Sequence, residues 1–207
     1  MPSGGHPIFA AFYDFFCDKI EKKGLACYRE KAAGGATGRV IEIGAGTGRN
    51  FPFYRAIDHL IAAEPDPYMR RRAIRRTRGL PFPVLLLSDP AEALSAADGS
   101  ADTIVATLVL CTVQNPGAAL RQIRRVLAPG GSFRFVEHVR AEGPRQARLQ
   151  DLVTPIHKRI AAGCHPNRDT AALIERVGFQ LVEFERFQLG PPWVRPHVFG
   201  VAVPDPR

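Results

Sequence analysis

A buried strand that runs directly into a cluster of glycines is the feature that most restricts the fold of this chain. Residues 40–43 read Val-Ile-Glu-Ile, and glycines follow at positions 44, 46 and 48. Glycine has no Cβ, so the backbone and a ligand can approach each other closely at such a turn. We expect the strand to turn sharply into a helix here. A dinucleotide-binding fold would instead carry G-x-G-x-x-G, so the spacing argues against a nicotinamide cofactor.

Strand-like and helix-like patterns alternate through the rest of the chain. Short apolar runs predict strands at residues 39–43, 59–63, 84–87, 102–108, 132–137, 181–187 and 197–203. Helices are predicted at residues 67–78, 116–127, 144–162 and 169–177. This order predicts an α/β fold, doubly wound around a mostly parallel seven-stranded sheet. Because no helix separates the last two strands, they should form an antiparallel C-terminal hairpin.

The length of 207 residues suits a single domain, within which three parts can be distinguished. We expect residues 1–36 to form an N-terminal helical lid, residues 37–140 a cofactor-binding core, and residues 141–207 the acceptor-side helices with the closing hairpin. Four aromatic residues recur at helical spacing in the first part, and two interpretations stay open, packing in the core or covering the ligands. They are Phe9, Phe12, Tyr13 and Phe16.

The sequence has no apolar run long enough to cross a bilayer and no secretory signal, which predicts a cytoplasmic protein. Its formal net charge is +8, and six arginines lie between positions 70 and 78. This run is either the solvated face of a helix or a peripheral contact with an anionic membrane. A nucleic-acid substrate is disfavoured, because the chain has no N/D-P-P-Y/F motif and no added RNA-binding module. The oligomeric state stays open.

The four cysteines do not predict a metal site. Cys17, Cys27, Cys111 and Cys164 include no C-x-x-C pair, so we expect free thiols and no bound metal.

Two carboxylates stand in register with the glycine loop. Glu42 lies two residues before the first glycine, and Glu64 ends the second predicted strand. In doubly wound folds an acid at the second position accepts hydrogen bonds from ribose hydroxyls. The other interpretation of Glu64 is a charge at the N-terminus of the next helix.

Together with Glu42, the G-x-G-x-G loop resembles the first motif of the class I S-adenosylmethionine (SAM)-dependent methyltransferases. Residues 88–94 resemble their G-D-A-E-A-L turn, although Pro90 stands where an adenine-binding Asp is usual. The resemblance implies the Rossmann-like SAM methyltransferase fold, with SAM as cofactor and S-adenosylhomocysteine (SAH) as product. It assigns cofactor binding to Glu42, Gly44, Ala45, Gly46, Gly48, Asn50, Glu64, Pro65, Asp89, Ala91 and Leu108.

Later segments resemble one group within this superfamily, the alkyl thiol S-methyltransferases known from mammalian microsomes and their bacterial relatives. The resemblance covers roughly residues 38–203. It rests on four segments, Thr107–Val113, Phe135–Val139, Gly163-Cys164 with Arg168, and Trp193–Gly200. It implies methyl transfer to a small acceptor, a thiol or sulfide first. The mammalian members carry an apolar N-terminal membrane anchor, from which this sequence departs.

A thiol acceptor is already a few per cent thiolate at neutral pH, and a positive site would raise that fraction. The candidates for this role are His138, Arg168, Arg195 and His197. Two alternatives are kept. One is a phospholipid or natural-product N- or O-methyltransferase, and the other is a non-catalytic SAM-binding sensor.

Overall fold

The N-terminal part of the chain is helical. The structure, a computed structural model, describes residues 7–205, without the side chains of residues 8–12 and 16. It begins with α1 (Pro7–Ile20), a single π-helical turn η1 (Glu21–Leu25) and α2 (Ala26–Gly34). The predicted aromatic stripe falls on α1. Of its members only Tyr13 is described, since the side chains of Phe9, Phe12 and Phe16 lie outside the described part.

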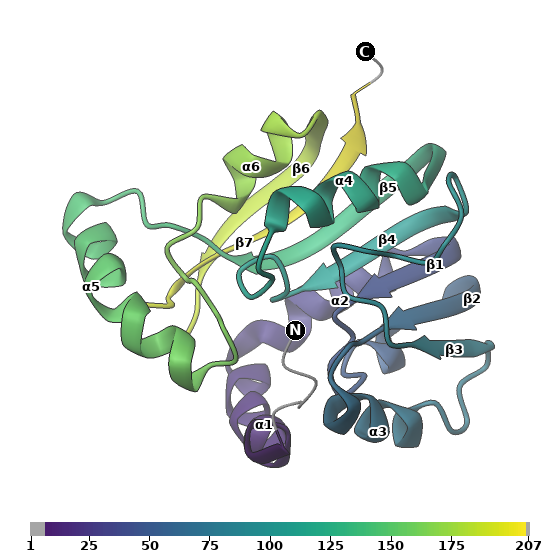
Figure 1. The fold of residues 1–207 in the computed structure, drawn as a ribbon, viewed down its shortest axis with the longest axis horizontal. Coiled ribbons are helices and arrows are strands. Elements are labelled where there is room, and N and C mark those ends of the chain that lie inside the picture. Colours follow the sequence, from purple (N-terminus) through teal and green to yellow (C-terminus); the bar gives the residue numbers. More distant parts are fainter. Residues whose placement is uncertain (1–6, 206–207) are drawn as a thin grey trace.

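All seven predicted strands are present, and the helices predicted at residues 67–78, 116–127, 144–162 and 169–177 follow in the predicted order (Figure 1). Several helices begin at a side-chain cap. Asp66, for example, accepts the backbone N–H groups of Tyr68 and Met69 at the start of α3. In chain order the elements are β1 (Thr37–Ile43), η2 (Phe51–Phe53), β2 (Ala56–Ala63), α3 (Pro67–Arg76), β3 (Val84–Leu87), β4 (Ala101–Thr107), α4 (Pro116–Val126), β5 (Leu127–His138), α5 (Pro144–Ile160), α6 (Thr170–Arg176), β6 (Phe179–Gln188) and β7 (Pro196–Pro204).

The strands form one sheet in the order β3-β2-β1-β4-β5-β7-β6. β1 to β5 pair in parallel, whereas β7 lies antiparallel between β5 and β6. The predicted fold class, a doubly wound sheet with an antiparallel C-terminal hairpin, is therefore confirmed. The strand order reverses between β1 and β4, and ligands of such sheets bind at the carboxyl ends of the strands beside that switch point.

Alternate residues of each central strand face opposite sides of the sheet, which gives two cores. Ile41 and Ile43 of β1 belong to the core that α4 and α6 cover, together with Leu120 and Ile174. Val40 faces the other core, where α2 and α3 contribute alanines and Phe51 is fully buried. Covering both faces of a parallel sheet explains why the buried parts of its strands are mostly apolar on both sides.

The helix expected after the glycine loop is absent, and this prediction was wrong. Residues 44–50 form turns, followed by the short 3₁₀-helix η2. Pro52 lies at the start of η2, where its missing N–H and fixed φ prevent a longer helix from forming through residues 48–55. Only 12 residues, 44–55, separate β1 from β2, so an α-helix of ordinary length does not fit. The loop is held by side chains instead.

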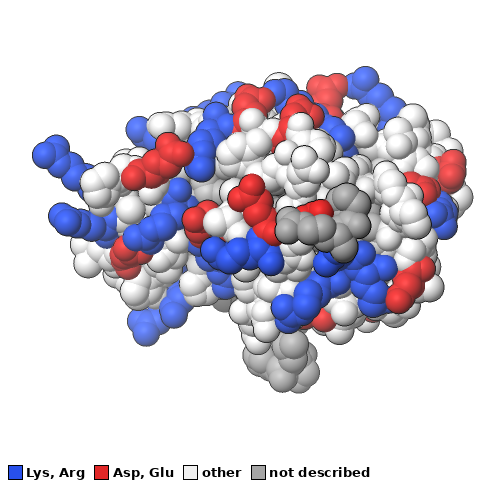
Figure 2. All heavy atoms as spheres, turned by 90° about the horizontal axis from the view of Figure 1, so that it is seen from above, with Lys and Arg blue, Asp and Glu red and all other residues white. Residues whose placement is uncertain are grey.

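Among the helices of residues 7–205, none combines the length and the apolar character needed to cross a membrane. On the face seen in Figure 2, Lys and Arg side chains are interspersed with Asp and Glu rather than gathered into one unbroken basic patch.

Candidate active site

The glycine loop lies at the carboxyl end of β1, and its shape depends on positive φ angles. Gly44, Gly46 and Gly48 have φ of 60°, 58° and 79°. A Cβ on Gly44 would lie 2.6 Å from Val109, so this glycine is required by packing. A Cβ on Gly46 would meet no protein atom closer than 3.9 Å. The space beside Gly46 is therefore open for a ligand to approach the backbone. Ala45 between them is fixed by its N–H, which donates to Ala63 O at 3.1 Å.

Glu42 lies beneath the loop, 2% exposed, with both carboxylate oxygens occupied. Asn50 Nδ2 donates to Oε1 at 3.0 Å, and the Tyr54 hydroxyl donates to Oε2 at 2.8 Å. Asn50 in turn accepts from buried Arg29 Nη1 at 2.9 Å. Burial raises the pKa of Glu42 to about 7, although the bonds from Tyr54 and Asn50 oppose this shift. Glu42 and Asn50 thus order the loop from below.

Glu64, at the end of β2, reaches the loop from the side. Its Oε2 accepts the Gly46 N–H at 2.7 Å, and its Oε1 accepts the Asp66 N–H at 2.8 Å. Both interpretations of Glu64 therefore have a structural basis, since it lies beside the ligand loop and also at the start of α3. Burial raises its pKa, against these two backbone bonds. Pro65 follows it and is exposed.

The predicted adenine side, after β3, is only partly arranged for binding. Asp89 is half-buried, but its Oδ2 accepts both the N–H and the hydroxyl of Ser95, at 2.8 and 2.5 Å. Ala91 is buried, within the same core as β1 and β4. The turn is therefore fixed by Asp89 itself.

The loop after β4 is strained and tightly held. Leu108 has φ 59°, a backbone conformation that costs a branched residue free energy and that clusters at functional sites. Glu137 of β5, fully buried, accepts the N–H groups of Val109, Leu110 and Cys111 at 2.7, 2.8 and 3.1 Å. Glu137 is the last residue of the strand predicted at residues 132–137, and nothing in the sequence indicates this anchoring role, because its donors are backbone groups.

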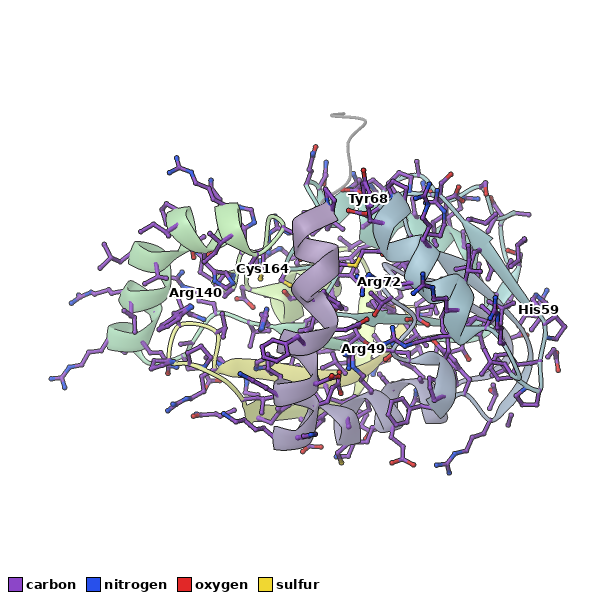
Figure 3. The ribbon with its side chains drawn as sticks, turned by 90° about the horizontal axis from the view of Figure 1, so that it is seen from below. Arg49, His59, Tyr68, Arg72, Arg140 and Cys164 are labelled. Atoms are coloured by element: carbon purple, nitrogen blue, oxygen red, sulfur yellow. The ribbon has the colours of Figure 1, made fainter. Side chains whose placement is uncertain are left out.

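Helix α1 is docked on the glycine loop through two acids, Asp14 and Asp18, of which Asp14 makes most of the contacts. Asp14 accepts the Thr47 hydroxyl at 2.8 Å and pairs with Arg49 at 3.1 Å. Arg72 and Arg76 of α3 lie 3.5 and 3.3 Å from the same carboxylate. In Figure 3 α1 crosses this edge of the molecule, with Cys164 on one side and Arg49 and Arg72 on the other. The first part of the chain is thus positioned beside both halves of the site.

These contacts also divide the arginine run in two. Arg70 donates to Glu64 O at 2.6 Å and Arg76 to Thr47 O at 2.6 Å, while Arg72 pairs with Asp14. These three side chains bind the loops around the site. The other three, Arg71, Arg75 and Arg78, are exposed. Half of the run therefore has a structural role that composition could not indicate.

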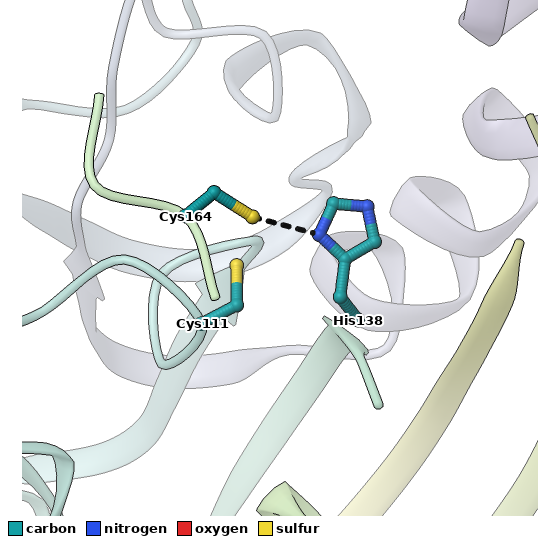
Figure 4. Close-up of side chains that lie close together, drawn as sticks. All are labelled: Cys111, His138 and Cys164. Atoms are coloured by element: carbon teal, nitrogen blue, oxygen red, sulfur yellow. Dashed lines mark hydrogen bonds between the residues drawn. The ribbon is translucent and has the colours of Figure 1, made fainter. Parts of the chain in front are cut away.

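On the acceptor side, Cys111, Cys164 and His138 lie together (Figure 4), and His197 lies beside His138. Cys164 Sγ is 3.3 Å from His138 Nδ1, and the rings of His138 and His197 are 4.4 Å apart between centroids. The hydrogen bond between the two sulfurs raises the pKa of Cys111 and lowers that of Cys164, toward which His138 and His157 also point. Burial and the neighbouring His138 lower the pKa of His197 to about 3, which favours its neutral ring over the positive form.

The two arginine candidates occupy different places. Arg168 Nη1 donates to the carbonyls of Leu110 and Val113 at 2.5 and 2.7 Å, so it holds the loop after β4. Arg195 is exposed and donates to Gly190 O at 3.3 Å. The structure therefore gathers His138, His197 and Arg168 around the cysteines. Arg195 lies in the connection between β6 and β7, where its side chain points to Gly190 O, and its backbone carbonyl accepts from His197 Nδ1 at 2.9 Å.

Comparison with known proteins supplies the context for this geometry. A family model described as "Methyltransferase domain" matches residues 41–135. The human thiol S-methyltransferase TMT1A is 35% identical over 170 residues, covering 79% of this chain and 70% of that protein. Human thiol S-methyltransferase TMT1B is 34% identical over 194 residues, covering 89% and 80%.

A solved structure described as the DhpI–SAH complex is 19% identical, with a TM-score of 0.68 over 97% of this chain and 94% of that chain. At this identity the likeness concerns the fold.

Proposed function

Because the chain belongs to the thiol S-methyltransferase family of human TMT1A and TMT1B, we propose that it methylates a small thiol. It is a SAM-dependent methyltransferase, and SAH is its second product. The observation that carries the thiol proposal is the meeting, at one edge of the sheet, of an open glycine loop and a polar cluster of two thiols and two imidazoles.

The residues of the loop fit SAM. Gly46 leaves room for close approach, and Glu64 is placed to accept ribose hydroxyls with the lone pairs that its two backbone bonds leave free. We assign the remaining cofactor contacts to the Gly44–Gly48 loop, Leu108, and the turn at Asp89 and Ala91. When bound, SAM supplies a methyl group already activated on a sulfonium. The chain has only to bind, orient and exclude water.

The reaction is a displacement at the methyl carbon. The acceptor loses its S–H proton, and its sulfur forms the new S–CH₃ bond while the carbon–sulfonium bond breaks and leaves its electron pair on SAH. Since a free thiol has a pKa near ~8.5, modest help with the proton is sufficient. We assign that help to the polar group around His138, which lies at the carboxyl end of β5 beside Cys164.

The test uses untagged protein with a phosphine reductant, because a thiol reductant would itself be a substrate. Calorimetric titration with SAH measures cofactor binding, and transfer from methyl-labelled SAM to a panel of small thiols measures turnover. Gly46→Ala serves as the cofactor-site control. Thiol turnover supports the proposal, whereas transfer only to phosphatidylethanolamine vesicles or to amines would replace it. Tight SAH binding without turnover on any acceptor would favour the sensor.

The exposed arginines Arg71, Arg75 and Arg78 suit a peripheral contact with an anionic membrane. We propose this as a secondary property, and co-sedimentation with phosphatidylserine vesicles at low and high salt tests it. The cytoplasmic location stays a prediction from the sequence.

A further inference from the structure

Three side chains that ordinarily bind soft metal ions meet on the acceptor side of the site. Cys111 comes from the loop after β4, His138 from the end of β5 and Cys164 from the loop after α5 (Figure 4). One ligand atom of each lies within 4.8 Å of the other two, and Cys164 Sγ is 3.3 Å from His138 Nδ1. Both thiols are buried, at 1% and 5% exposure. The group is therefore enclosed by protein rather than scattered on the surface.

The backbone around this group is fixed by bonds that do not involve the three side chains. The His165 N–H donates to Cys111 O at 2.7 Å, which ties the two cysteine segments to each other. Glu137 accepts the Cys111 N–H, and Arg168 donates to the carbonyls on either side of Cys111, those of Leu110 and Val113. A site held by an outer layer of this kind is organised before any ligand arrives.

The spacing suits tetrahedral coordination. Zinc binds thiolate sulfur at about 2.3 Å and imidazole nitrogen at about 2.0–2.1 Å, which puts two sulfurs about 3.8 Å apart and a sulfur about 3.6 Å from a nitrogen. Cys164 Sγ lies 3.3 Å from His138 Nδ1 and no distance within the group exceeds 4.8 Å, so side-chain adjustments of about 1 Å would suffice. Two cysteines and one histidine are also a ligand set of catalytic zinc sites, in which the fourth position stays open.

We propose that Cys111, His138 and Cys164 bind one zinc ion, whose fourth coordination position takes the acceptor thiol. The second half of this proposal rests on the proposed function, and the first half does not. The two cysteines and the acceptor each release their S–H proton on binding. The acceptor, bound as a thiolate, then forms the S–CH₃ bond as the carbon–sulfonium bond breaks. This inference replaces the expectation, drawn from the absence of a C-x-x-C pair, that the chain binds no metal.

The first experiment measures metal binding by untagged protein, independently of activity. After incubation with Zn²⁺ and dialysis, we expect one zinc per chain by elemental analysis. Replacement with Co²⁺ should give the red absorption bands of a tetrahedral ion and a near-ultraviolet thiolate-to-metal band. Cys111→Ser, Cys164→Ser and His138→Ala should each lose most of the metal. Cys27→Ser is the matched control, since Cys27 is an exposed free thiol, and it should retain the full amount.

Titration with SAH checks that each variant is folded, because SAH is expected to bind at the glycine loop. Absence of zinc from the unaltered protein would overturn the proposal. Retention of zinc by the Cys111→Ser and Cys164→Ser variants would overturn it as well, since the metal would then lie elsewhere. Recovery of a Cys111–Cys164 disulfide from protein kept under reducing conditions would assign the pair to redox chemistry instead.

The second experiment separates the open position from a closed one. His157 of α5 also approaches Cys164, although it lies outside the group of three. If the fourth position is open, His157→Ala retains the Co²⁺ spectrum, and a small thiol shifts that spectrum in both proteins. Loss of metal from His157→Ala, or a spectrum indifferent to thiols, would overturn the open position while leaving the thiol methyltransferase proposal intact. Thiol turnover by fully metal-free protein would likewise overturn the open position and leave the thiol methyltransferase proposal intact.

Discussion

The carboxylate of Glu64 accepts the backbone N–H of Gly46 at 2.7 Å, across the gap between the end of β2 and the middle of the glycine loop. This bond joins the two strand ends that flank the expected ribose position. It also places a buried carboxylate beside Gly46, a residue of positive φ that borders open space. Loop shape and ribose recognition therefore depend on the same side chain.

Glu64→Ala should weaken SAH binding by about 1–3 kcal/mol, because the loop loses its lateral bond and the ribose loses its acceptor. Calorimetric titration measures the change. Asp98→Ala is the control, since Asp98 is an exposed carboxylate just before β4, near the amino end of that strand and not at the carboxyl ends where the glycine loop lies. Equal SAH affinity in wild type and Glu64→Ala would remove Glu64 from the cofactor site.

Gly44 and Gly46 should respond differently to the same substitution. Alanine at either position incurs the strain of a positive φ, about 1–2 kcal/mol. Only at position 44 does the new Cβ also overlap Val109, which adds about 1–3 kcal/mol of overpacking. We expect Gly44→Ala to lower the free energy of unfolding markedly, and Gly46→Ala to fold well but bind SAH poorly. Denaturant unfolding and SAH titration of both variants would reveal any reversal of this order.

The fold could be predicted from the sequence because its signals are local. Apolar runs and caps such as Asp66 act within a few residues, so the seven strands and the order of the helices followed directly. The helix expected after Gly48 does not form because Pro52 and the short connection to β2 override the general strand–loop–helix pattern.

The site could be predicted only where one motif contains it. Glu42, Glu64 and the glycines stand at fixed spacings, and the structure gathers them around one loop. Asp14 and Glu137 act on partners far away in the chain, and no periodicity indicates such contacts. The cysteine–histidine group could not be predicted for the same reason, since its ligands come from three separate segments.

Burial of Glu42 makes folding dependent on pH. Its pKa is raised from 4.5 to about 7 in the folded protein, so the folded state binds a proton that the unfolded state releases. The contribution of Glu42 to the free energy of unfolding is therefore fully present below pH 4.5 and is lost as the pH rises to about 7. The loss amounts to about 3 kcal/mol.

Glu42→Gln tests this linkage, because the amide keeps an acceptor for Asn50 and a polar partner for the Tyr54 hydroxyl. We expect the free energy of unfolding of Glu42→Gln to decline less steeply between pH 4.5 and 7 than that of wild type. Denaturant titrations at three pH values measure both slopes. Parallel slopes would mean that Glu42 is ionised in the folded protein throughout this range.

Asp14 connects α1 to the glycine loop, so its loss should reach the cofactor. Asp14→Ala leaves the Thr47 hydroxyl without its acceptor and separates Arg72 and Arg76 from α1. We expect SAH affinity to fall roughly fivefold, or about 1 kcal/mol. Amide exchange in residues 7–20 should quicken. Asp18→Ala is the matched control, since Asp18 is exposed on the same helix and pairs with Arg49 rather than with Thr47 or the arginines of α3. Similar behaviour of the two variants would show that the junction at Asp14 has no special role.

Arg168 and Arg195 were predicted for the same task, and the structure separates them. Arg168 binds the two carbonyls that flank Cys111, whereas Arg195 is exposed and bonds a carbonyl of its own connection. Arg168→Ala leaves two partly buried carbonyls without this donor, which should destabilise the protein by about 1–3 kcal/mol. Because the loop after β4 then loosens on its acceptor side, kcat/KM for the thiol should fall tenfold or more.

A merely structural role for Arg168 would lower stability and leave the kinetics of the surviving folded enzyme unchanged, so the two readouts are measured together. SAH affinity should stay within twofold of wild type, since the glycine loop does not depend on Arg168. Arg168→Lys can donate to one carbonyl at a time and should recover part of kcat/KM. Arg195→Ala should change neither quantity by more than about twofold. If Arg195→Ala instead abolished turnover with SAH binding intact, Arg195 would have to move toward the acceptor on binding, and the acceptor side would extend to the hairpin of β6 and β7.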